Sequence, residues 1–208
     1  DFAKQAERLY REETQGLPRI AFDRHLYLPL LVEKEDTFFK SAPPALKPSE
    51  TQFVRDLKAF WEEEKDKTLA GKEIYLLRNL SRGKGIGFFE ERGFYPDFIL
   101  WVLNDETQRI IFVEPDGMLH AKAYERDEKA RLWERLRELG EQMARRSGSK
   151  NVSLDSFIIS APPFDTLREH YGDGTWDLEK FAKKHILFQQ RSDSYDYIRY
   201  LLNNPCES

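Results

Sequence analysis

The sequence is poor in residues that cross-link a chain, and it lacks any segment that could span a membrane. Its 208 residues include one cysteine, Cys206, so neither an internal disulfide nor a thiolate zinc site can form. The longest uninterrupted apolar run, Phe98–Leu103, is far shorter than the ~18 residues of a membrane span. No apolar secretion signal opens the chain. We therefore expect a soluble protein of a reducing cytoplasm.

The chain also lacks an excess of positive charge. It has 33 lysine and arginine residues against 37 aspartate and glutamate residues, a net charge of −4, and an isoelectric point near 5.7. This balance excludes a polycation that coats nucleic acid irrespective of sequence. The stretch 122–150 is nevertheless locally basic, with nine basic and six acidic residues. A nucleic-acid track and a charged helix face both account for it.

A proline-rich stretch divides the chain. Three prolines lie within six positions of the segment Ser41–Pro48, which cannot form a helix. We place a domain boundary there. Residues 1–40, which begin without methionine, are interpreted as the tail of an upstream domain, and residues 41–208 as the main domain. We expect the whole to be a piece of a longer polypeptide.

The main domain shows the periodicities of an α/β fold. A capping box over Ser49–Gln52 predicts a helix that runs to about Lys67. Its inward face carries Glu50 and an apolar stripe: Phe53, Val54, Leu57, Phe60 and Trp61. Strands are predicted over 73–78, 95–103, 109–114 and 153–160, a long helix over 124–146, and a short strand and a terminal helix over 185–188 and 195–202. The long helix has one apolar side: Leu132, Leu136, Leu139 and Met143. The order helix, three strands, helix, strand predicts an α/β arrangement.

Two acidic residues are expected to face each other in this sheet. If the central hairpin pairs symmetrically about the midpoint of Asp105 and Glu106, Asp97 lies opposite Glu114. Two carboxylates so close repel each other unless a cation neutralises them, and Mg²⁺ does so with a few carboxylates, water and phosphate oxygens. Glu50 is a candidate third acid. The alternative roles are structural: a strand start, a strand end and a first-turn acid favoured by the helix dipole.

The segments around these acids resemble a nuclease family. Phe94–Trp101 and Arg109–Gly117 resemble the PD-(D/E)xK core of many restriction enzymes and junction resolvases. The nearest resemblance is to the C-terminal nuclease domain of superfamily 2 (DEAD/DEAH) helicases of the type III restriction enzyme Res-subunit kind. Further similar segments extend the resemblance from about residue 21 to 202: Phe22–Tyr27, Ser49–Leu57, Tyr75–Leu80, Gly85–Phe89, Asp155–Ser160 and His185–Gln189.

The resemblance implies a fold, an activity and partners. The expected fold is a restriction-endonuclease-like αβββαβ core with a mixed sheet flanked by helices. The expected activity is metal-dependent hydrolysis of phosphodiester bonds, chiefly of DNA, with Mg²⁺ as cofactor and Mn²⁺ as its substitute. The expected partners are nucleic acid and a covalently attached upstream helicase/ATPase domain, in restriction, defence or repair. No membrane partner is expected.

One position departs from the family pattern. A lysine normally stands two residues after the second acid, where it orients the attacking water and offsets charge on the phosphate. Here Asp116 stands there, and the resemblance implies that it binds metal or accepts a proton from water instead. Lys122, Lys84 and His120 are candidates to restore the cation. The alternative is that Asp116 opens a tight Asp-Gly turn and that the domain is an inactive nuclease-like module. Such a module would bind nucleic acid or a partner and regulate the attached helicase.

The expected site therefore combines an acidic centre with basic contacts. The catalytic candidates are Glu50, Asp97, Glu114 and Asp116, of which Asp97, Glu114 and Asp116 are the expected metal ligands. The candidate nucleic-acid contacts are Lys122, and Arg82 and Lys84 in the glycine-rich turn 79–87. A solvated hairpin tip is the alternative interpretation of that turn.

Overall fold

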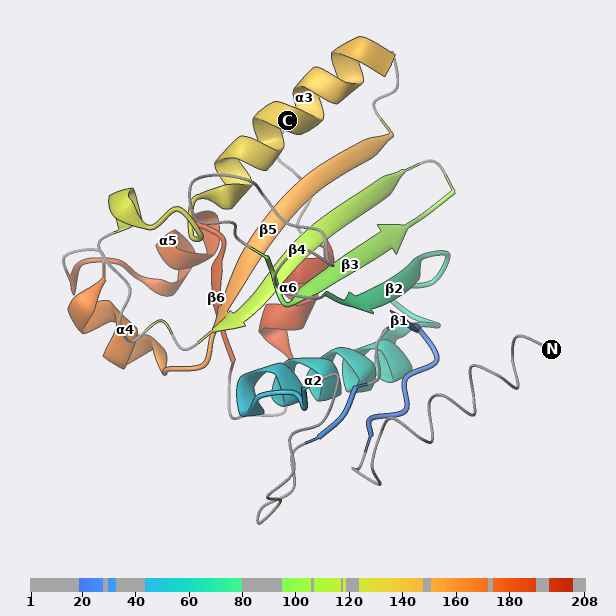
Figure 1. Ribbon diagram of the computed structural model, residues 1–208, viewed down its shortest axis with the longest axis horizontal. Helices are drawn as coiled ribbons and strands as arrows, with labels where there is room; N and C mark the ends of the chain where they lie inside the picture. The colour runs from blue at the N-terminus through green and yellow to red at the C-terminus, as the bar shows by residue number, and fades with distance from the viewer. Residues whose placement is uncertain are drawn as a thin grey trace.

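The computed structural model describes residues 19–27, 30–32, 44–79, 95–105, 107–116, 118, 124–147, 151–171, 174–189 and 195–203. Within these ranges, six strands form one mixed sheet in the order β1 to β6, with helices on both faces (Figure 1). The strands are β1 (His25–Tyr27), β2 (Glu73–Arg78), β3 (Phe98–Leu103), β4 (Gln108–Asp116), β5 (Val152–Ser160) and β6 (Ile186–Phe188). The helices are α2 (Pro48–Glu64), α3 (Leu132–Ser147), α4 (Phe164–His170), α5 (Leu178–Lys183) and α6 (Asp196–Asn203), and a 3₁₀ turn, η2 (Tyr124–Arg126), precedes α3.

Three strands form an antiparallel meander, and the other strands join it in parallel. β2 pairs with β3 and β3 with β4 in antiparallel fashion, whereas β1 joins β2, β5 joins β4 and β6 joins β5 in parallel. The parallel β4–β5 pair requires a crossover connection, which contains α3. The order α2, β2, β3, β4, α3, β5 confirms the expected α/β class, with a mixed sheet flanked by helices.

Helices cover both faces because successive strand residues point to opposite sides. On one face, Phe98 and Leu100 of β3 share a buried cluster with α2 and α6. On the other, Ile99 packs with Leu132 and Leu136 of α3, and a neighbouring aromatic cluster joins α4 and α5 to β6. The predicted apolar stripe of α2 is confirmed, since all five members lie in the first cluster. Among the described residues, no helix is long and apolar enough to cross a membrane.

The start of α2 differs from the expected capping box. The helix begins at Pro48, and Lys47 is its N-cap. The backbone N–H of Lys47 donates to Oε2 of Glu50 at 3.3 Å. The pairing of Ser49 with Gln52 is therefore wrong. Proline suits the first helical position because it has no N–H to satisfy there. The helix therefore starts earlier than expected, with Lys47 instead of Ser49 as its N-cap, and Glu50 instead of Gln52 is the capping side chain.

The predicted strands are found with shifted ends. β2 has the expected bounds, but β3 begins at Phe98 rather than at residue 95. Pro96 precedes it and has no N–H to donate to a sheet ladder, which explains the later start. β4 extends one residue before and two residues after the expected range 109–114, through Asp116.

The segment expected as one helix over 124–146 is divided. Its first residues form η2, and α3 begins only at Leu132. Between them, the carboxylate of Asp127 accepts a hydrogen bond from the backbone N–H of Ala130 at 3.2 Å. Aspartate side chains compete for backbone donors in this way and favour turns over helix interiors. Lys129 consequently lies on a turn, not on a helix.

The apolar side of α3 is covered for half of its length. Leu132 and Leu136 are buried, but Leu139 and Met143 are 42% and 45% exposed. At their level Gly140 approaches the sheet, since a Cβ there would lie 3.8 Å from the backbone N of Leu154. The predicted apolar side of α3 is therefore buried over the first half of the helix and exposed over the second.

The described part of the segment before residue 41 packs on the rest of the chain. β1 pairs with β2, and Phe22 and Leu30 lie in the same buried cluster as α2. The backbone N–H of Leu46 donates to the carbonyl of Leu31 at 2.7 Å. These contacts make the described part of the segment one edge of the sheet. That residues 1–40 form the tail of an upstream domain stays a prediction.

Candidate active site

Three of the four acidic candidates come together where β3 begins and β4 ends. The β3–β4 pairing runs from Phe98–Val113 to Leu103–Gln108, which confirms the predicted register. Asp97 comes directly before the first of these pairs, and its backbone N–H donates to Oε2 of Glu114 at 3.0 Å. Glu114 is 8% exposed. The symmetric hairpin therefore brings the two acids side by side.

Hydrogen bonds to backbone groups fix the start of β3. The side-chain amide of Asn79, directly after β2, donates to the carbonyl of Pro96 at 2.8 Å. Its backbone N–H donates to the carbonyl of Asp97, also at 2.8 Å. Asp97 is thus held by β2 on one side and by Glu114 on the other.

The first turn of α2 brings Glu50 to the same place. The hydroxyl of Ser49 donates to the carbonyl of Pro115 at 3.0 Å, and the amide of Gln189 donates to the carbonyl of Ser49 at 2.7 Å. The start of α2 is therefore tied to the end of β4, next to Glu114. Glu50 is 5% exposed, which confirms its predicted inward position.

The electrostatics of Asp97 follow from this crowding. Burial, then the charges of Glu114 and Glu50, raise its pKa from 3.8 to about 7, and Lys47 and Lys129 act in the opposite direction. Its Oδ2 is buried and receives no hydrogen bond from the described residues. Among the described residues, no hydrogen bond therefore compensates the burial of Oδ2 of Asp97.

Two lysines border the acids. Nζ of Lys129 lies 2.9 Å from Oε1 of Glu114, and Nζ of Lys47 lies 3.3 Å from Oε1 of Glu50. Partial burial lowers the pKa of Lys47, but Asp97, Glu50 and Glu114 together raise it above its ordinary value. Each of the two lysines thus forms an ion pair with one of the two glutamates.

Arg78 at the end of β2 adds a third positive charge nearby. Its guanidinium donates to the carbonyl of Pro44 at 2.6 Å. Burial lowers the pKa of Arg78, against the opposing charges of Glu50 and Asp97. Three cations from separate parts of the chain, Lys47, Lys129 and Arg78, therefore lie near the acidic cluster.

Sequence reasoning missed these three cations. Lys129 belongs to the basic stretch 122–150, and Lys47 directly precedes the first expected helix. Neither lysine stands at a fixed sequence distance from the acids that would mark it as their neighbour. The local excess of basic residues therefore gave only a weak indication of Lys129.

The donor chemistry fits a hard divalent cation. The converging side chains offer only carboxylate oxygens, which Mg²⁺ prefers, and Oδ2 of Asp97 is a buried acceptor without a donor among the described residues. Those same residues contain no group of three or more His, Cys, Asp or Glu side chains arranged to hold a metal. The backbone of Asp116 ends β4 opposite Ser160, and its side chain lies outside the described part. The fit therefore rests on Asp97 and Glu114.

The remaining candidates cannot be placed. Arg82 and Lys84 of the glycine-rich turn, together with Lys122 and His120, all lie outside the described residues. Their assignments as nucleic-acid contacts or as a replacement cation stay predictions.

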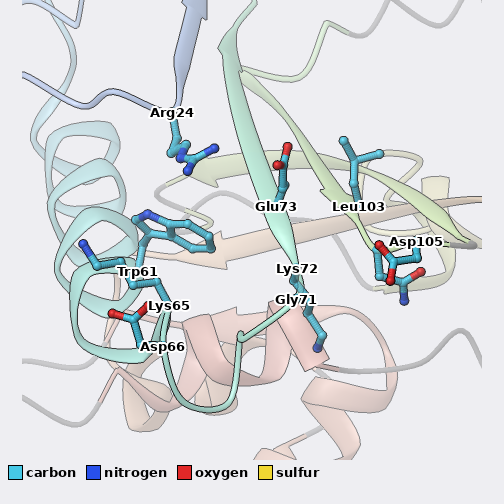
Figure 2. A pocket seen from close by; sticks show the side chains of 10 residues that line it. Arg24, Trp61, Lys65, Asp66, Gly71, Lys72, Glu73, Leu103 and Asp105 are labelled. Carbon is cyan, nitrogen blue, oxygen red and sulfur yellow. The ribbon is translucent and has the colours of Figure 1, made fainter.

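A separate cleft of about 500 Å³ lies at the opposite ends of β2 and β3 (Figure 2). Glu73, which begins β2, and Leu103, which ends β3, both line it. Arg24 extends over the ring of Trp61 at 5.2 Å. The other lining residues are Lys65, Asp66, Gly71, Lys72, Asn104 and Asp105. Its three positive and three negative side chains balance each other, so the cleft offers no strong field and is distinct from the acidic cluster.

Comparison of the chain with protein-family models, curated proteins and solved structures found no match. A functional interpretation therefore rests on the acids and their surroundings, together with the motif resemblance. Both concern the same place in the fold, because the motif acids Asp97 and Glu114 are the residues that the sheet brings together.

Proposed function

We propose that the chain is a metal-dependent nuclease domain that hydrolyses phosphodiester bonds of DNA within a cytoplasmic helicase-nuclease protein. The observation that carries the proposal is the state of Asp97. It lies beside Glu114 and Glu50, its pKa is raised to about 7, and its buried Oδ2 has no donor among the described residues. Strongly perturbed acids of this kind concentrate at catalytic and metal sites.

Asp155 shows what a structural buried acid looks like in the same protein. It is 2% exposed and lies 2.6 Å from Nη2 of Arg109 and 2.8 Å from Nδ1 of His185. Burial raises the pKa of Asp155, but the bonds and charges of His185 and Arg109 outweigh burial and lower it. Oδ2 of Asp97 has no such partner among the described residues, and a buried carboxylate oxygen without a hydrogen bond costs stability. A functional role for Asp97 explains why the protein keeps this carboxylate better than a structural role does.

Each acid receives a role under this proposal. Asp97 and Glu114 would hold Mg²⁺, or Mn²⁺ as its substitute, with Asp116 as an auxiliary ligand or base. Bound magnesium supplies the charge that activates water and stabilises the leaving oxygen. Glu50 completes the acidic set from α2. The hydrogen bond from the backbone N–H of Asp97 holds the carboxylate of Glu114 beside Asp97.

The attached helicase remains part of the proposal. A net charge of −4 gives the chain little general attraction to a polyanion, so an upstream helicase/ATPase would supply much of the grip on DNA. Arg82, Lys84 and Lys122 would add local phosphate contacts. The proposed helicase-nuclease protein would act in restriction, defence or repair.

The test compares three forms of the chain on single- and double-stranded DNA and on RNA, with Mg²⁺, Mn²⁺ or EDTA. We expect metal-dependent cleavage by wild type and a loss of about 100-fold or more in the double variant Asp97→Asn, Glu114→Gln. Glu63→Gln, an exposed acid of α2, is the matched control and should cleave as wild type does. Equal cleavage by wild type and the double variant would refute the proposal.

A second candidate function is favoured by Asp116 in the lysine position. An inactive nuclease-like domain would bind nucleic acid or a partner and regulate the attached helicase. Calorimetry with Mn²⁺ distinguishes the two. A working site should bind Mn²⁺ through Asp97 and Glu114, and an inactive platform should bind it poorly. Metal-dependent cleavage by the purified chain would rule the second candidate out.

A further inference from the structure

We infer that Lys129 supplies the catalytic cation that the sequence lacks at position 116. This inference rests on the proposed nuclease function and names a residue that the motif does not contain. Its basis is the contact between Nζ of Lys129 and Oε1 of Glu114 at 2.9 Å.

The geometry of a strand explains why this contact matters. Residues two apart on a strand point to the same face, so a lysine at position 116 would place its amine beside the carboxylate of Glu114. Lys129 brings an amine to that same carboxylate from the turn before α3. A positive charge can therefore reach the carboxylate of Glu114 either from position 116 on β4 or from the turn before α3.

The turn that carries Lys129 is anchored on both sides. Before it, the backbone N–H of Asp127 donates to the carbonyl of Tyr124 at 3.0 Å. After it, Ala130 is 2% exposed, and its N–H donates to the carboxylate of Asp127 at 3.2 Å. The backbone of Lys129 is thus positioned by packing and not only by its own ion pair. Its side chain is 45% exposed, so it lies at the surface beside the acidic cluster.

Lys47 is less suited to this role. Its amine lies by Oε1 of Glu50 at 3.3 Å, on the α2 side of the cluster, and its backbone N–H caps the helix through the other oxygen of Glu50. It therefore belongs to the structure of the helix start. Lys129 forms its ion pair with Glu114, whereas the ion pairs of Lys47, Lys65, Lys67 and Lys183 are with other acids.

The chemistry asked of Lys129 is non-covalent. In hydrolysis the oxygen of water forms a bond to phosphorus as the bond to the leaving oxygen breaks, and one proton of that water ends on the leaving oxygen through solvent. Lys129 keeps its protons throughout. Its ammonium group orients the water and stabilises the charge that grows on the phosphate oxygens, which is worth most in the transition state.

The experiment moves the amine between the two positions. Lys129→Gln should lower kcat by about 100-fold, in the range observed for loss of one charge-stabilising donor. Adding Asp116→Lys to Lys129→Gln should restore kcat to within about 10-fold of wild type. Lys65→Gln is the matched control: Lys65 is 41% exposed and lies 2.9 Å from Glu62 at the far end of α2. This control should leave cleavage unchanged.

Mn²⁺ binding by calorimetry gives a readout independent of cleavage. Because Lys129 occupies one oxygen of Glu114, Lys129→Gln should tighten Mn²⁺ binding several-fold while it slows cleavage. A merely structural lysine would weaken both or affect neither. Thermal unfolding within about 2 °C of wild type checks that each variant is folded.

The outcomes separate this inference from the proposed function. Wild-type cleavage together with unchanged cleavage and unchanged Mn²⁺ binding in Lys129→Gln overturns the inference alone. Lost cleavage that a folded Lys129→Gln, Asp116→Lys variant does not recover also overturns it. Wild type that cleaves no better than Asp97→Asn, Glu114→Gln overturns the proposed function and the inference with it.

Discussion

Replacing Asp97 by asparagine should stabilise the metal-free protein at alkaline pH. Asp97 has a pKa of about 7 in the folded chain against 3.8 ordinarily. Between these values the folded state holds a proton that the unfolded state has lost, so stability falls as pH rises from about 4 to 7. The cost of ionised Asp97 is absent below about pH 4 and complete above about pH 7.

The size of the effect follows from the two pKa values. They differ by about 3, and each unit corresponds to about 1.4 kcal/mol, which gives a full cost of about 4 kcal/mol. Because Asp97 is only partly buried and salt screens its neighbours, we expect Asp97→Asn to gain about 2–4 kcal/mol at pH 8.5. At pH 4 the same substitution should change stability by less than about 1 kcal/mol.

Urea unfolding of wild type and Asp97→Asn at pH 4 and pH 8.5, with EDTA present, measures these differences. The matched control is Asp155→Asn, which removes a buried acid held by Arg109 and His185. The lowered pKa of Asp155 means that its contribution is present above its unfolded pKa and is lost as pH falls. Asp155→Asn should therefore destabilise the chain at pH 8.5, by about 2–4 kcal/mol. If Asp97→Asn also destabilises at pH 8.5, the reasoning about its unneutralised charge is wrong.

Three further results should follow from the same structure. Mg²⁺ at about 100 times its dissociation constant should add about 2.7 kcal/mol to the unfolding free energy of wild type and nothing to Asp97→Asn, Glu114→Gln, by thermal melts; an equal gain in both would place the metal elsewhere. Leu136→Ala should cost about 2–5 kcal/mol in urea, whereas Leu139→Ala on the exposed part of α3 should cost less than about 1 kcal/mol; equal costs would contradict the half-covered helix. Ser49→Ala removes the bond from α2 to the end of β4 and should cost about 1 kcal/mol while lowering kcat; unchanged kcat would show that Glu50 does not depend on this tie.

Much of the fold was predictable because its signals are local. The apolar spacing of α2, the continuous apolar strands β3 and β4 and the short loop between them determine element type and register without knowledge of distant residues. Register then places Asp97 beside Glu114, so the centre of the candidate site could be found from the sequence. Errors arose where two local signals compete, as at Asp127, whose carboxylate forms a turn inside an otherwise helical pattern.

The surroundings of the acids could not be predicted in this way. Lys129 was assigned to a helix and given no role, because its contact with Glu114 crosses 15 residues and depends on how the turn packs. The amine of Lys47 and the guanidinium of Arg78 reach the cluster because α2 begins beside the end of β4 and β2 ends beside the start of β3. Such contacts have no period in the sequence, since they are set by packing between elements.

The sequence by itself determined the α/β order, the hairpin register and the pairing of Asp97 with Glu114, because each depends on backbone geometry repeated over a few residues. Tertiary structure alone decided how much those charges are neutralised. Folding buries Oδ2 of Asp97 without a donor among the described residues, gives Asp155 two partners, and sets Lys129 against Glu114. The physical reason is that the free energy of a buried carboxylate depends on solvent access and on neighbours brought from distant parts of the chain.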